Sequence, residues 1–273
     1  MKKYLPICLN LIQKIRQEDL SKTANDMTYK LLLALFPLLM FLLTVLGFFE
    51  LDIYYITDVL ADVIPTEILG IVEVFTAEVV NVRRPSLLSF SILFTLYSAS
   101  GGFRSMMSGV NAAYGLQEKR GPIQVYAISL LMVLTFTLAI VFSIVGIVFS
   151  TLIIDFLRQW LTLSPLMVVL YNFLTFLVTF VIVIGAILCI NRISLYKKIR
   201  LRALLPGAIF TALGWLIASG GFSIYVTNWG NMASVYGSVG GFMVLMIWLN
   251  ILCHVLVIGA GFNAVVMAER KKE

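Results

Sequence analysis

The stretch Tyr29–Phe49, "YKLLLALFPLLMFLLTVLGFF", decides the fold of this chain. Residues 31–49 contain no charged side chain, and a helix needs about 20 such apolar residues to cross the hydrocarbon core of a bilayer. Pro37 lies inside the run, where a helix loses one backbone hydrogen bond. Neighbouring helices can satisfy the freed carbonyl group, so the proline indicates a kinked helix packed inside a bundle. The kink is either a hinge or a static bend.

Five further apolar runs predict spans at 85–107, 123–154, 164–191, 203–228 and 235–267. The runs are apolar on every face, whereas the strands of a membrane barrel alternate apolar and polar residues. Of the 273 residues 60% are hydrophobic and 12% charged, against roughly 25% charged in a soluble domain. The sequence therefore predicts an all-α integral membrane protein with six transmembrane helices in one domain, 31–267.

The positive charges support an even number of spans. With both ends of the chain in the cytoplasm, seventeen of the 20 basic residues fall on the inner side, and only Arg83, Arg84 and Arg158 fall outside. This is the asymmetry that the positive-inside rule describes. The net charge of +6 thus reflects orientation beside anionic lipids, and we expect membrane lipids as partners and no nucleic acid.

Three segments flank the predicted spans. Residues 1–30 form a cytoplasmic amphipathic head, in which Ile7, Leu11 and Ile15 recur at helical spacing. Such a head is either an interfacial helix or a solvated connector. Residues 50–84 form an acidic external segment with one or two helices, whose acids either draw cations to a pore or face solvent. Residues 268–273 are a cytoplasmic tail.

The composition argues against an enzyme. His254 is the single histidine, and Cys8, Cys189 and Cys253 are far apart, so the chain lacks the usual ligands of a catalytic zinc. It also lacks a Walker loop of the form G-x-x-x-x-G-K-[ST]. We expect neither a metal nor a cofactor, and no ATP hydrolysis.

The pentapeptide "ASGGF" occurs twice, at 99–103 and 218–222. Small residues allow close contact between helices in lipid, which is the simplest explanation. In a three-plus-three arrangement, however, the two copies fall on corresponding helices that face opposite ways, as in transporters built from inverted repeats. Two inverted three-helix halves and coincidence in a biased composition both remain open.

Several other polar residues lie in or beside the predicted spans. The uncharged stretch 225–241 is either a re-entrant loop lining a cavity or an exterior turn. Asn250 and His254 share a helix face, where they form either a proton switch or an interhelical hydrogen bond. Arg104 is either a positive-inside anchor or a ligand for an anionic group. The candidate cavity or hinge residues are Pro37, Ser100, Gly101, Gly102, Arg104, Asn111, Ser219, Gly220, Gly221, Asn228, Tyr236, Asn250, His254 and Asn263.

Three phrases carry a resemblance to a known family: "TYKLLLALFPLLMFLLTVLG" in the first span, the stretch 204–252 with "YGSVGG" and "IWLN", and "GAGFNAVV" near the end. The chain resembles the YihY/virulence factor BrkB family of bacterial inner-membrane proteins. The resemblance implies a six-helix protein of the plasma membrane. Members have been labelled ribonuclease BN, and others have been linked to serum resistance or to export of envelope lipids. Relatives commonly have "GAELNA" where this chain has Gly261 and Phe262, so a role of that carboxylate does not carry over.

Together these patterns predict an ATP-independent transporter or exporter of a small or amphiphilic solute, lipid-like solutes included. A coupling ion, the substrate and the oligomeric state stay open. The alternative is a membrane scaffold or envelope-integrity protein without transport. A transporter should have a polar vestibule lined by Asn250, His254 and the "ASGGF" helices, whereas a scaffold should be packed solid. A ribonuclease finds no support in the residues.

Overall fold

The computed structural model describes residues 5–47, 85–160, 165–229 and 238–270. In these ranges every element of regular structure is a helix, which confirms the predicted all-α class. The helices are α1 (Leu5–Gln17), α2 (Leu20–Gly47), α5 (Pro85–Ala113), α6 (Pro122–Trp160), α7 (Pro165–Ser194), α8 (Leu201–Trp229) and α10 (Ser238–Arg270).

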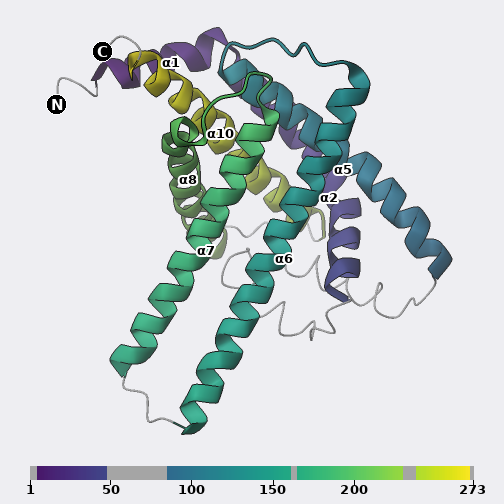
Figure 1. Ribbon diagram of the computed structural model, residues 1–273, viewed down its shortest axis with the longest axis vertical. Coiled ribbons are helices and arrows are strands. Elements are labelled where there is room, and N and C mark those ends of the chain that lie inside the picture. The colour runs from purple at the N-terminus through teal and green to yellow at the C-terminus, as the bar shows by residue number, and fades with distance from the viewer. Residues whose placement is uncertain (1–4, 48–84, 161–164, 230–237, 271–273) are drawn as a thin grey trace.

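The six helices other than α1 each have one end near the same side of the molecule, and α6 and α7 reach farthest from it (Figure 1). We call this side the terminal end, because α1 and the last turns of α10 lie there together with the connections 114–121 and 195–200. The shortest of the six, α2, has 28 residues, or about 42 Å at 1.5 Å per residue. Each is therefore long enough to cross a bilayer.

Within the described residues, four helices combine the length and the apolar composition that a membrane span needs: Pro122–Ser143, Leu166–Ser194, Leu201–Thr227 and Gly240–Arg270. They correspond to the last four predicted spans. The side chains of 35–47 and 85–95 lie outside the described residues, so apolarity along the first two spans stays a prediction. The external segment 50–84 lies wholly outside the described residues.

Helix bounds differ from the predicted spans at several places. Helix α2 begins at Leu20, so part of the predicted head belongs to the first long helix. The reason is that Leu20, Ala24 and Met27 face the core and are almost fully buried. Helix α6 continues to Trp160, beyond the predicted limit of 154. A run without charges thus marks the middle of these helices but not their ends.

Helix α1 lies across the terminal end and packs against the last turns of α10. The amide of Asn10 donates a hydrogen bond to a carboxylate oxygen of Glu269 at 3.1 Å. Leu9 and Ile12 of α1 stay exposed. An amphipathic helix at this place has the apolar and polar faces that contact with a membrane surface requires.

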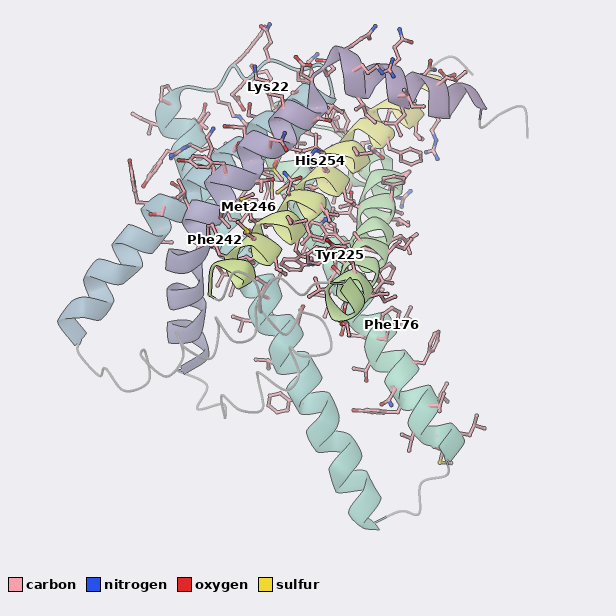
Figure 2. The ribbon with its side chains drawn as sticks, turned by 180° about the vertical axis from the view of Figure 1, so that it is seen from behind. Lys22, Phe176, Tyr225, Phe242, Met246 and His254 are labelled. Atoms are coloured by element: carbon pink, nitrogen blue, oxygen red, sulfur yellow. The ribbon has the colours of Figure 1, made fainter. Side chains whose placement is uncertain are left out.

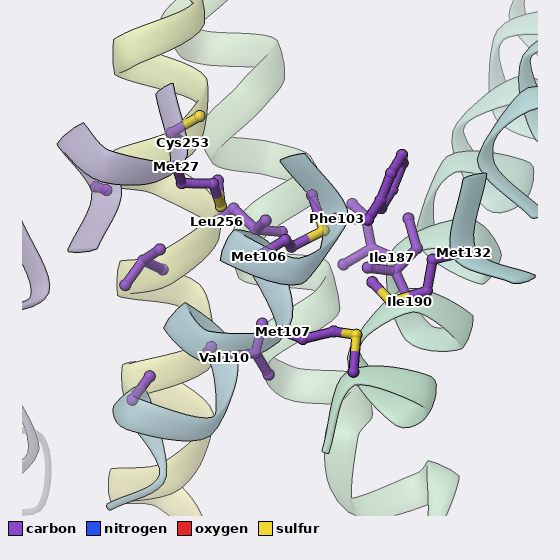
Figure 3. Packing of buried hydrophobic residues seen from close by; sticks show 14 of the residues in the cluster. Met27, Phe103, Met106, Met107, Val110, Met132, Ile187, Ile190, Cys253 and Leu256 are labelled. Carbon is purple, nitrogen blue, oxygen red and sulfur yellow. The ribbon is translucent and has the colours of Figure 1, made fainter. Parts of the chain in front are cut away.

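The main hydrophobic core lies between α2, α5 and α10 and extends to α6 and α7 (Figure 3). Met27, Phe103, Met107, Val110 and Leu256 are among its fully buried side chains. The far half of the α6–α7 pair projects beyond the other helices (Figure 1). Only 11% of the span in α7 is buried, against 28% in the three other spans. The apolar side chains of α7 therefore face the surroundings, which in a membrane are lipid.

Candidate functional site

An interrupted helix forms the first part of the site. Pro206 lies inside α8 and removes a backbone donor from the helix. Beside it, the side chain of Asn263 from α10 accepts a hydrogen bond from the Gly207 N–H at 2.8 Å and donates one to the Ala203 carbonyl at 2.8 Å. These two backbone groups are four residues apart, the spacing of partners in a regular α-helix. We call this arrangement the amide bridge.

Helices α8 and α10 touch at the amide bridge because both carry glycine there. A Cβ on Gly207 would lie 2.5 Å from the Cβ of Asn263 and 2.8 Å from the carbonyl oxygen of Gly259. A Cβ on Gly259 would lie 2.0 Å from Oγ1 of Thr211, a hydroxyl that donates to the Gly207 carbonyl at 2.9 Å. Small residues are what such close contact requires.

Tyr114 connects the amide bridge to the end of α5. Its hydroxyl accepts a hydrogen bond from Nδ2 of Asn263 at 2.7 Å. Burial raises the pKa of Tyr114 to about 12, so the phenol is neutral at physiological pH. The Asn263 side chain is itself buried, and its hydrogen bonds join α10 to both α8 and the end of α5.

Asn111 makes a second buried contact of this kind at the terminal end. Its amide donates to the Ser194 carbonyl at 2.9 Å and accepts from the Tyr196 N–H at 2.9 Å. Arg120 also donates to the Ser194 carbonyl, at 2.7 Å, and pairs with Glu118. The hydrogen bonds from Arg120 hold the pKa of Glu118 below its ordinary value. Side chains from 111–120 thus cap the end of α7.

Asn250 and His254 are four residues apart on α10, and Asn250 joins this helix to α2. Nδ2 of Asn250 donates to Oδ1 of Asn25 at 2.9 Å and to Oγ1 of Thr28 at 3.2 Å. Nδ1 of His254 lies 2.9 Å from the Asn250 carbonyl. Because a carbonyl only accepts, this contact requires the proton on Nδ1. Figure 2 shows the order along the molecule, with Lys22 nearest the terminal end, then His254 and then Met246.

The two "ASGGF" copies have different surroundings. In α5 a Cβ on Gly102 would lie 2.6 Å from Cδ2 of Leu31, so this copy contacts α2 closely. In α8 no described atom lies within 4 Å of a Cβ placed on Gly220 or Gly221. Ser219 accepts a long hydrogen bond of 3.4 Å from the indole of Trp248.

Among the described residues, the remaining candidates lie apart from the amide bridge, on α5, α2 and the end of α8. Ser100, Gly101 and Arg104 lie together on α5, where Ser100 Oγ accepts from the Arg104 guanidinium at 3.1 Å. Pro37 lies within α2, but its side chain and that of Asn228 are outside the described residues, as is the whole of Tyr236.

The structure also contains a groove that the sequence analysis did not predict. It lies between α6 and α7 and has a volume of about 170 Å³. Its lining consists of Ser143, Gly146, Leu174, Thr175, Val178, Thr179 and Ile182. We call it the α6–α7 groove; none of the predicted candidates lines it. One sequence signal could have indicated it, since Thr175 and Thr179 are four apart and therefore share one face of an otherwise apolar helix.

In the described part of the chain, no group of three or more histidine, cysteine, aspartate or glutamate side chains could hold a metal ion. The α6–α7 groove offers hydroxyl groups beside aliphatic side chains. The lining is chiefly apolar, and the hydroxyl of Ser143 donates to the Ala139 carbonyl at 2.8 Å.

Comparison with known proteins gives a consistent result. The family described as "Virulence factor BrkB" matches residues 11–273. "Putative ribonuclease-like protein YfkH" of Bacillus subtilis (strain 168) is 32% identical over 255 residues, which cover 93% of this chain and 92% of that protein. A "UPF0761 membrane protein" of Tolumonas auensis is 33% identical over 88 residues, covering 32% of this chain and 29% of that protein. No solved structure matches the chain.

Proposed function

The chain belongs to the virulence factor BrkB family of membrane proteins, and from this premise we propose that it is an ATP-independent transporter of an amphiphilic solute. In this proposal α2, α5, α6, α7, α8 and α10 cross the bacterial inner membrane, and both ends of the chain lie in the cytoplasm. The observation that carries the proposal is the α6–α7 groove, with its hydroxyl groups in the lipid-facing part of the molecule.

The position of the groove supports a path between two halves. In chain order, α2, α5 and α6 precede it, and α7, α8 and α10 follow it. Transporters commonly move solutes along the interface between such halves. The hydroxyls of Ser143, Thr175 and Thr179 would contact the polar head of the solute, while Leu174 and Val178 would contact its apolar part.

The amide bridge supports a moving helix. Pro206 removes the N–H that would pair with the Arg202 carbonyl, and the neighbouring Gly207 and Ala203 are hydrogen-bonded to Asn263 of α10. Side-chain hydrogen bonds between helices can exchange when two helices rearrange, and transporters place interrupted helices where such movement occurs. A rearrangement of α8 against α10 would alter the half of the bundle that borders the groove.

We further propose that the protein is not an enzyme. The name ribonuclease-like belongs to the Bacillus subtilis relative. Among the residues lining the α6–α7 groove there is no histidine, carboxylate or lysine to activate the serine or threonine hydroxyls. Binding and translocation, without a chemical step, suit this lining.

Reconstitution tests the proposal with a defined probe. We expect vesicles containing the full chain to move a fluorescent phosphatidylglycerol between leaflets faster than protein-free vesicles, without ATP. Gly146→Leu should abolish this activity, because described atoms leave the space around Gly146 open for a side chain that fills the groove. Gly185→Leu is the matched control, since Gly185 of α7 has equally open surroundings and does not line the groove.

The outcomes separate the candidate functions. Loss of transfer in Gly146→Leu with retention in Gly185→Leu supports the groove as the path. Equal transfer in both variants contradicts it. Transfer no faster than in protein-free vesicles, tested with and without sodium and proton gradients, contradicts transport of this probe and favours the membrane scaffold.

A further inference from the structure

Arg104 is a half-buried cation in the terminal half of α5. It lies nine residues before Ala113, where the helix ends, which is about 14 Å along the helix axis. Phe103 and Ser105 on either side of it are buried. If α5 crosses the membrane as proposed above, this distance places Arg104 near the level where headgroups meet hydrocarbon.

The contacts of Arg104 fix the guanidinium without neutralising it. Nη1 donates to Oγ of Ser100 at 3.1 Å, and Cζ lies 5.3 Å from the ring centroid of Tyr126 on α6. The ion pairs among the described residues involve other cations, namely Lys14, Lys30 and Arg120. A guanidinium has five N–H donors, and the bond to Ser100 uses one of them.

An acid on the neighbouring helix α2 is bound to other residues. Asp26 of α2 accepts from Nζ of Lys30 at 2.7 Å and from Oγ of Ser105 at 2.7 Å. Within the described residues Arg104 has no carboxylate within ion-pair distance. A half-buried charge is costly in a membrane unless an opposite charge meets it, so the site is complete only with an anion.

We propose that Arg104, held in place by the buried Ser100 and by Tyr126, is a binding site for the phosphate of an anionic phospholipid in the cytoplasmic leaflet. The planar guanidinium matches a phosphate group with two parallel hydrogen bonds. The Tyr126 ring holds it in place through a cation–π contact. The bound lipid is a structural ligand of the bilayer, distinct from the transported solute.

A specific site differs from general attraction to basic residues. Charge attraction at a membrane surface depends on the number of cations near it. A guanidinium site also depends on the shape of the donor group, so lysine cannot replace arginine fully. Lys22 is a suitable comparison, because it is exposed on α2 near the terminal end (Figure 2) and carries the same charge.

The full chain in dodecyl maltoside, stripped of lipid, tests the site. The probes are dioctanoyl phosphatidylglycerol, dioctanoylglycerol without phosphate, and inorganic phosphate. We expect only the phospholipid to raise the unfolding temperature of the wild type, because a ligand stabilises the state that binds it. Arg104→Gln should lose this shift, Arg104→Lys should keep part of it, and Lys22→Gln should keep all of it.

Three results would overturn the proposal. They are an undiminished shift in Arg104→Gln, an equal loss in Lys22→Gln, and an equal shift with inorganic phosphate, which would indicate a soluble anion. If Arg104→Gln does not fold, Tyr126→Leu takes its place: a weakened shift supports the site and an unchanged one contradicts it. The assay measures binding alone, so its result is independent of the vesicle transfer experiment.

Discussion

The side chain of Asn263 makes hydrogen bonds to Gly207, Ala203 and Tyr114 while almost fully buried. In lipid no water replaces a lost backbone partner, and the buried amide gives backbone groups on either side of Pro206 a donor and an acceptor from another helix. An asparagine amide provides both on one planar group. Removal of this side chain leaves several polar groups without partners at once.

Asn263→Leu should therefore reduce the free energy of unfolding by about 3 kcal/mol, since each unsatisfied buried group costs about 1–3 kcal/mol. Asn250→Leu is the matched control, because Asn250 is only half-buried, its partner Asn25 is exposed, and the buried Thr28 hydroxyl keeps its bond to the Ala24 carbonyl. It should cost less than about 1 kcal/mol. Reversible unfolding in detergent measures both. Equal losses of unfolding free energy in the two variants would contradict a larger contribution of the amide bridge.

The lowered pKa of Glu118 predicts that the stability of the fold decreases in acid. Its pKa in the folded chain is lowered from the ordinary value of 4.5, first of all by the hydrogen bond from Arg120. The pair therefore stabilises the fold fully above pH 4.5, and this contribution is lost as the pH falls through the lower folded value. Glu118→Gln should flatten the dependence of the unfolding midpoint on pH in that acid range. If the unfolding midpoints of the wild type and Glu118→Gln depend on pH in the same way, the Glu118–Arg120 pair does not cause the acid dependence.

At the scale of whole helices, the α8–α10 contact depends on glycines that the sequence shows only as small residues. Gly259→Ala should destabilise the fold, because its Cβ would collide with the Thr211 hydroxyl. Gly220→Ala should be neutral or stabilising by up to about 1 kcal/mol, because that site is open among described atoms and alanine favours helix. Adding Thr211→Ala to Gly259→Ala should restore part of the lost stability. Thermal unfolding of the wild type, the two single variants and the double variant measures these effects. Similar effects of Gly259→Ala and Gly220→Ala would contradict close packing of α8 and α10 at Gly259.

The sequence predicted the middle of the helices better than their ends. Runs without charge correctly located α6, α7, α8 and α10 as long apolar helices. The same criterion missed the first turns of α2, because Lys22, Asp26 and Lys30 interrupt the run. Those charges lie on the exposed face, while Ala24 and Met27 face the core. A criterion based on one buried face would have found the earlier start.

At the scale of the whole molecule, sequence periodicity could identify polar residues but not their partners. Asn263 was a candidate because it lies in an apolar helix, yet nothing in α10 specifies that it meets Gly207 across the bundle. The α6–α7 groove was missed for the same reason, since its lining comes from two helices and includes common residues such as Ser143 and Thr179. The "ASGGF" copies have different surroundings, because small residues serve both tight contact and open faces.

The orientation of the helices in the bilayer underlies every functional proposal for this chain, and single-cysteine labelling tests it most directly. In a background with Cys8, Cys189 and Cys253 replaced by alanine, one cysteine is placed at Gln117, in the connection after α5, or at Arg158, near the opposite end of α6. A membrane-impermeant maleimide should label the Arg158→Cys protein in intact spheroplasts and the Gln117→Cys protein only after lysis. Labelling of both positions in intact spheroplasts, or of Gln117→Cys alone, would contradict six crossings with cytoplasmic ends.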